Sequence, residues 1–94
     1  MVSLKVINFI KIIYFKIKIM WQEEDNKLYK KFTFKDFVAA FSFTTSVAIL
    51  AEKVDHHPTW KNTYNTVEIW LCTHDKGNSI TEKDRALAKL IDNI

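Results

Sequence analysis

The sequence predicts an α+β domain, in which a four-stranded antiparallel sheet has three helices packed on one face. Some regions alternate between apolar and polar residues, as half-buried strands do, and others repeat apolar residues at helical spacing. Strands joined by hairpins and separated by helices are typical of an antiparallel sheet with helices on one face. A chain of 94 residues without repeats or a linker is expected to form one domain over residues 1–94.

The first 20 residues are apolar and basic. Residues 2–14 are predicted to form a helix that packs on the domain or on a partner subunit. Four lysines and no acid give this segment a charge of +4, which leaves −1 for the rest of the chain. Its longest uncharged stretches are about five residues, far short of the roughly 20 that span a bilayer. We expect no membrane partner and no signal peptide, although a basic amphipathic anchor is the alternative.

A hairpin is expected next. Residues 16–21 (Lys-Ile-Lys-Ile-Met-Trp) alternate and predict a strand, residues 24–26 are polar and predict a turn, and residues 28–34 alternate again. Residues 34–54 change to helical spacing and contain no Gly or Pro. Thr33 and Asp36 resemble a capping box for this helix.

The second half of the chain is also expected to form strands followed by a helix. Pro58 disfavours helix at the preceding residue, so residues 55–58 end the helix. Residues 60–73 are rich in aromatic and β-branched residues and predict one long strand, or two strands divided by a bend. Val67, Ile69 and Leu71 are expected to share one face. A loop around Gly77 then leads to a last helix, capped by Thr81 with Asp84 at the third position. Its apolar stripe is expected to comprise Leu87, Leu90 and Ile91.

The one cysteine, Cys72, can form neither an internal disulfide nor a zinc knuckle. It is expected to be a buried, inert thiol in a reducing compartment.

The three histidines are the candidate catalytic residues. His56 and His57 precede Pro58, and His74 follows the long strand, so all three could meet at one end of the sheet. Imidazoles give and take protons near neutral pH, and Asp55 and Glu52 could orient them. A structural role for each histidine remains an alternative. A three-histidine metal site is another, which adjacent residues in extended chain fit poorly because they point to opposite faces.

Several motifs together resemble those of the pterin-4a-carbinolamine dehydratase family. The similarity covers about residues 21–94. It rests on the following segments: Glu52–Trp60 (EKVDHHPTW), Tyr64–Val67, Thr73–Asp75, Phe32–Phe37, Thr81–Asp84 and Leu87–Ala88.

The resemblance implies a four-stranded antiparallel sheet with three helices, assembly into a homodimer or homotetramer, and no metal or organic cofactor. It implies dehydration of 4a-hydroxytetrahydrobiopterin to quinonoid dihydrobiopterin and water, which recycles a pterin. The implied catalytic residues are His56, His57 and His74, with His56 and His74 in acid–base roles and His57 binding the pterin. The implied supporting residues are Glu52, Asp55, Pro58, Trp60, Lys83 and Asp84.

The chain also departs from the family pattern. Lys83 stands where many relatives have Arg, and the loop at residues 75–80 differs from the commoner Gly-rich version. No motif of the family is recognised in residues 1–20. The similarity does not distinguish biopterin from another pterin, or a dimer from a tetramer.

A second function is implied by the same resemblance, because some relatives are dimerisation partners of a homeodomain transcription factor. The balanced charge of residues 21–94 argues against direct contact with nucleic acid. The expected location is the cytoplasm, with the nucleus as the alternative.

Overall fold

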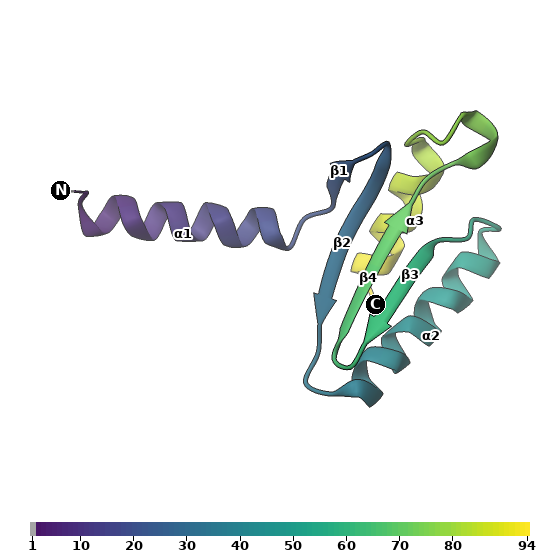
Figure 1. The fold of residues 1–94 in the computed structure, drawn as a ribbon, viewed down its shortest axis with the longest axis horizontal. Coiled ribbons are helices and arrows are strands. Elements are labelled where there is room, and N and C mark those ends of the chain that lie inside the picture. The colour runs from purple at the N-terminus through teal and green to yellow at the C-terminus, as the bar shows by residue number, and fades with distance from the viewer. Residues whose placement is uncertain (1) are drawn as a thin grey trace.

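The computed structural model describes residues 2–94 and confirms the α+β class (Figure 1). In chain order its elements are α1 (Leu4–Lys18), β1 (Gln22–Glu24), β2 (Lys27–Thr33), α2 (Phe37–Lys53), β3 (Thr59–Thr63), β4 (Thr66–Leu71), the 3-10 turn η1 (His74–Lys76) and α3 (Glu82–Asp92).

The four strands form one antiparallel sheet in the order β1-β2-β4-β3. Two-residue turns set its register. Asp25 and Asn26 have φ of 51° and 61° and join β1 to β2, a conformation that Asp and Asn tolerate well. Tyr64, with φ of 48°, lies in the turn that divides residues 60–73 into β3 and β4. Of the two predictions for residues 60–73, the structure therefore has two strands divided by a bend and not one long strand.

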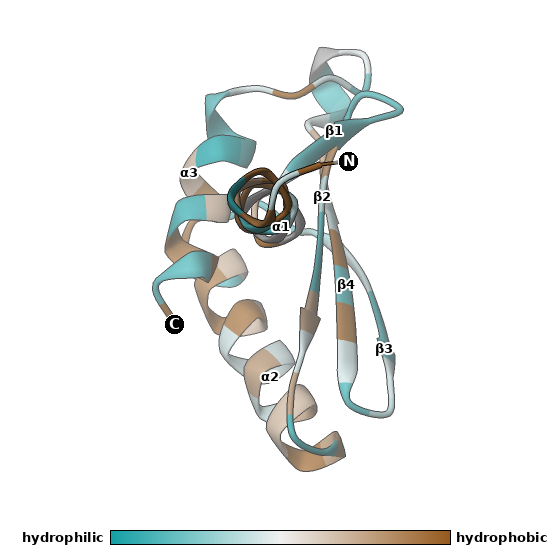
Figure 2. Ribbon diagram, turned by 90° about the vertical axis from the view of Figure 1, so that its left-hand side faces the viewer, coloured by the Kyte–Doolittle hydropathy of each residue, from teal (hydrophilic) through white to brown (hydrophobic). Residues whose placement is uncertain are grey.

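Helices α2 and α3 cover one face of the sheet (Figure 2). The predicted alternation in β4 is confirmed, because Val67, Ile69 and Leu71 are buried. They form the core with residues from both helices, which include Val47, Ala51, Leu87 and Ile91. Leu90, which was expected on the apolar stripe, is 39% exposed.

The helix caps confirm one prediction and correct another. Thr81 and Asp84 form the predicted capping box at the start of α3. At α2 the predicted box of Thr33 and Asp36 is wrong, because Asp36 itself is the N-cap and its Oδ1 accepts from the Ala39 N–H at 2.8 Å. The helix consequently begins at Phe37 rather than Phe34.

The predicted strand at residues 16–21 is wrong. Helix α1 continues to Lys18, and the first strand begins at Gln22. The Trp21 indole donates to the Asp92 carboxylate at 3.1 Å and its ring meets the edge of Phe32. This anchor turns the chain to the helix side of the sheet, so the preceding residues cannot continue the pairing.

Helix α1 does not pack on the sheet with the other two helices. It projects from the body of the molecule (Figure 1), and residues 2–14 are exposed. Within residues 2–94, no helix is both long and apolar enough to cross a membrane.

Candidate functional site

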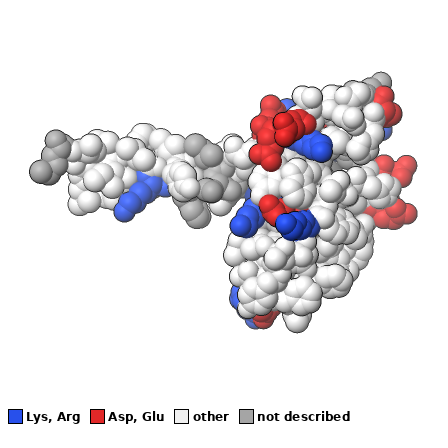
Figure 3. Space-filling view, in the orientation of Figure 1, with Lys and Arg blue, Asp and Glu red and all other residues white. Residues whose placement is uncertain are grey.

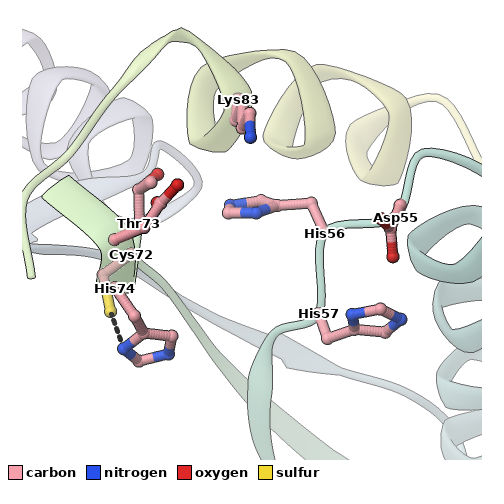
Figure 4. A pocket seen from close by; sticks show the side chains of 8 residues that line it. Asp55, His56, His57, Cys72, Thr73, His74 and Lys83 are labelled. Atoms are coloured by element: carbon pink, nitrogen blue, oxygen red, sulfur yellow. Dashed lines mark hydrogen bonds between the residues drawn. The ribbon is translucent and has the colours of Figure 1, made fainter.

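A cleft of about 290 Å³ lies where the loop after α2, the end of β4 and the start of α3 meet (Figure 4). Three histidines line it together with polar residues: the full set is Asp55, His56, His57, Cys72, Thr73, His74, Asp75 and Lys83. The structure thus brings His56, His57 and His74 to one cavity, although they come from segments about 17 residues apart in the sequence.

The chain between α2 and β3 separates the two adjacent histidines. Asp55 adopts a left-handed φ of 52°, and the His56 N–H donates to the Ala51 carbonyl at 3.1 Å. Pro58 follows and keeps His57 extended. In Figure 4 the His56 ring lies below α3 and the His57 ring lies on the other side of the loop.

His56 is held by a buried carboxylate. Its Nε2 lies 2.6 Å from Asp84 Oδ1; the Asp84 side chain is fully buried, and the His56 side chain is 12% exposed. Asp84 Oδ2 accepts from the Thr73 hydroxyl and the Thr81 N–H, each at 2.8 Å. Every oxygen of this carboxylate therefore has a partner, as a buried charge requires.

These contacts determine the charge of Asp84. Burial alone would raise its pKa, but the hydrogen bonds from His56, the Thr81 N–H and Thr73 together hold the pKa of Asp84 below its ordinary value of 3.8. Asp84 is therefore ionised at neutral pH and can only accept hydrogen bonds. It follows that the proton between the two side chains belongs to His56 Nε2.

The other two histidines have more exposed partners. His57 Nε2 lies 2.8 Å from Glu52 Oε1, and the two side chains are 59% and 80% exposed. His74 Nδ1 lies 2.9 Å from Asn78 Oδ1 and 3.9 Å from Cys72 Sγ. The amide oxygen only accepts, so His74 Nδ1 donates to it, and Nε2 has no hydrogen bond among the described contacts.

The remaining predicted site residues take different places. Asp55 and Lys83 line the cleft, whereas Glu52 and Asp84 support histidines from behind it. Pro58 and Trp60 are not among the lining residues. Trp60 lies on the edge strand β3, paired with Ile69 and 40% exposed.

Sequence reasoning missed four residues of the site. Thr73, Asp75 and Cys72 line the cleft, and Asn78 holds His74. Cys72 is buried and unpaired, as predicted, but it faces the cavity beside His74. Three of them could have been predicted from their closeness to His74 in the sequence, because each lies within two positions of it.

Among residues 2–94, no group of three or more His, Cys, Asp or Glu side chains is placed to hold a metal ion. The histidines contact two carboxylates, one amide and the Cys72 thiol, and a carboxylate partner orients an imidazole for proton transfer.

The fold and the cleft define a class of protein: a small α+β domain whose cleft gathers three imidazoles, one of them fixed by a buried carboxylate. The model of the family Pterin 4 alpha carbinolamine dehydratase matches residues 14–94, and the chain belongs to this family.

Several relatives support this assignment. A protein of Prochlorococcus marinus (strain NATL2A), whose name places it among the pterin-4-alpha-carbinolamine dehydratases, is 55% identical over 71 residues, which is 74% of each chain. One from Bradyrhizobium sp. (strain ORS 278) with the same name is 50% identical over 76 residues, covering 79% of this chain and 75% of the relative.

Two solved structures are also similar. A transcriptional coactivator/pterin dehydratase from Brucella melitensis has a TM-score of 0.75 and 35% identity, over 98% of this chain and 95% of that one. A pterin dehydratase-like protein described as a RuBisCO assembly factor in the alpha-carboxysome has a TM-score of 0.63 and 27% identity, over 79% and 84%.

Proposed function

We propose that this protein dehydrates 4a-hydroxytetrahydropterins to quinonoid dihydropterins and water, by acid–base catalysis from its histidines. The observation that supports this proposal best is the cleft lined by His56, His57 and His74 in a chain of this family. The reaction needs one group to protonate the departing hydroxyl and another to remove a proton from a ring N–H. No redox change occurs, so imidazoles are sufficient.

His56 is suited to proton transfer because one of its nitrogens is already fixed. Nε2 is bonded to Asp84, which sets the orientation of the ring and leaves Nδ1 for the substrate. Among the described contacts, no hydrogen bond to His56 Nδ1 is found. We assign His56 and His74 to the acid–base steps: one ring, in its protonated form, gives a proton to the departing hydroxyl, and the other, neutral, takes the proton from the ring N–H.

His57 has a different environment, which favours binding over proton transfer. Its ring and its partner Glu52 are both largely exposed, so an incoming pterin can meet them at the mouth of the cleft. Lys83 lines the same cavity and adds a positive charge there at neutral pH. We assign His57, Lys83 and Asp55 to binding and orientation of the pterin.

The test is a rate measurement. The substrate is generated in situ by a hydroxylase, and appearance of quinonoid dihydropterin is compared with the spontaneous rate. His56→Ala and His74→Ala are expected to lower kcat by about 100-fold or more. His57→Ala is expected to raise KM more than it lowers kcat. Lys61→Ala, on the open sheet face, is the matched control and should keep the wild-type rate. Folded protein that does not accelerate the reaction would exclude the proposal.

A second candidate function is protein binding, and one surface favours it. Val38, Phe41 and Ile49 are 72%, 57% and 65% exposed and follow one another at helical spacing on α2. This apolar stripe faces away from the core and could bind a second copy or another protein. The two candidates separate experimentally, because Val38→Glu with Ile49→Glu would abolish partner binding and leave the histidines in place.

A further inference from the structure

Helix α1 presents a continuous apolar face that no other described part of the chain covers. Val6, Phe9, Ile10 and Ile13 follow the i, i+3, i+4, i+7 spacing that places side chains on one side of a helix. Their exposed fractions lie between 41% and 63%. Val2, which precedes the helix, is also 58% exposed. Such a contiguous exposed surface marks a site of interaction.

The charges of this segment indicate what kind of partner would cover the face. Lys5 lies at one border of the apolar face, and Lys11 lies on the side opposite to it, as the helical period places them. On the face that Figure 3 shows, the coloured part of the projecting helix carries positive charge and no negative charge. Residues 1–20 carry four lysines and no acid. A negatively charged surface with an apolar interior is complementary to both features.

The dimensions favour a position in the plane of a membrane surface. Helix α1 has 15 residues, which corresponds to about 22 Å, shorter than the roughly 30 Å hydrocarbon core of a bilayer. Its lysines can keep their ammonium groups in the headgroup layer while the apolar face enters the acyl boundary. Leu4 and Ile12 are exposed apolar residues on the lysine-bearing side of α1. They widen the apolar surface that the helix can place against lipid.

We propose that α1 is an interfacial helix that binds the surface of anionic lipid membranes and tethers the catalytic domain there. The helix projects from the body, so it can lie on a bilayer without covering the cleft. A second copy of the chain is the less favourable occupant, because pairing two such helices would bring lysines of like charge together without an acid to compensate. The sequence predicted no membrane partner, and the alternative drawn from it, a basic amphipathic anchor, is the one that the exposed helix favours.

The test measures binding of the full-length chain to phosphatidylcholine vesicles with about one third phosphatidylserine, by co-sedimentation. Lys5→Gln with Lys11→Gln is expected to weaken binding by roughly 20- to 30-fold, since each basic residue contributes about a fivefold gain near an anionic surface. Phe9→Ser with Ile10→Ser should weaken it as well. Both pairs should keep the wild-type melting temperature and dehydration rate, because these side chains lie outside the core and the cleft.

Lys31→Gln with Lys61→Gln is the matched control. It removes the same charge from the exposed sheet face and should leave vesicle binding within about twofold. Three results would overturn the proposal. One is failure of the chain to bind the anionic vesicles, and the second is equal binding to pure phosphatidylcholine. The third is a concentration-dependent dimer, lost on Phe9→Ser with Ile10→Ser, that forms whether or not vesicles are present.

Discussion

Asp84 is a single carboxylate with two roles in this molecule. Its Oδ1 holds the His56 ring at 2.6 Å, and its Oδ2 accepts the Thr81 N–H that begins α3. The helix cap and the residue that positions the proposed catalytic His56 are thus one side chain. Damage to Asp84 should therefore reduce stability and turnover together.

Asp84→Asn tests this directly. The amide keeps the size but loses the charge, and its NH2 group would oppose a buried donor. We expect the free energy of unfolding to fall by about 3 kcal/mol, measured by urea denaturation, and kcat to fall by at least about tenfold. Glu23→Gln, which removes one partner of the exposed pair with Arg85, is the control and should cost less than about 1 kcal/mol. Equal effects of the two substitutions would contradict the shared role.

The lowered pKa of Asp84 also predicts how stability changes with pH. In the unfolded chain the carboxyl has its ordinary pKa of 3.8, and in the folded protein it is lower. The stability that the ionised form contributes is therefore present above pH 3.8 and is lost as the pH falls through the lower, folded-state pKa. Urea midpoints measured from pH 6 down to about pH 2 should show this loss in the wild type. In Asp84→Asn that part of the pH dependence should be absent.

Thr73 is one of the four residues of the site that the sequence did not single out for a role. Its hydroxyl, which is buried, donates to Asp84 and lies 2.7 Å from the Thr81 hydroxyl. Thr73→Val keeps the shape and should lower the free energy of unfolding by about 2 kcal/mol, since the lost bond is to a charged group. Thr45→Val removes a hydroxyl on the exposed side of α2 and should change it by less than about 0.5 kcal/mol. A Thr73 variant as stable as the Thr45 variant would show that the hydroxyl contributes little.

At the scale of elements, the start of α2 depends on one cap. Asp36 accepts the Ala39 N–H at 2.8 Å, so Asp36→Ala should lower the free energy of unfolding by about 1 kcal/mol, as seen by thermal denaturation. Asp36→Asn can still accept that bond and should retain most of the stability. Neither variant should alter KM, because the cap lies at the end of α2 remote from the cleft. A changed KM in both Asp36 variants would contradict this expectation and would indicate that a change at the start of α2 reaches the cleft at its other end.

Local patterns predicted most elements, and the exceptions have physical reasons. The capping box of α3 and the alternation of β4 depend on neighbours in sequence, so they could be predicted. The strand expected at residues 16–21 was wrong because its fate depends on Trp21 meeting Asp92, 71 residues away. The contact of His56 with Asp84 spans 28 residues, and no local pattern contains it. Motif similarity and the capping box pointed to Asp84 and its bond with Thr81, but its bonds with His56 and Thr73 came only with the fold.

At the scale of the whole molecule, assembly can be tested on α2. The stripe of Val38, Phe41 and Ile49 is exposed apolar surface, and a domain of 94 residues gains stability from burying such surface. We expect sedimentation equilibrium to show a dimer or tetramer. Val38→Glu with Ile49→Glu should give a monomer with a lower melting temperature. Lys53→Glu, on the last turn of α2, is the control and should leave the assembly unchanged. An assembly that survives the double substitution would place the interface elsewhere.

The hydrogen bond from the Thr81 N–H to Asp84 links hydrogen exchange at this amide to the state of the cleft. That amide can exchange its hydrogen for deuterium only when the first turn of α3 opens, and opening releases the carboxylate that holds His56. A pterin that occupies the cleft and immobilises His56 therefore disfavours the opened state. Deuterium uptake at Thr81 should slow when the cleft is filled, so that one backbone amide becomes a reporter of ligand occupancy.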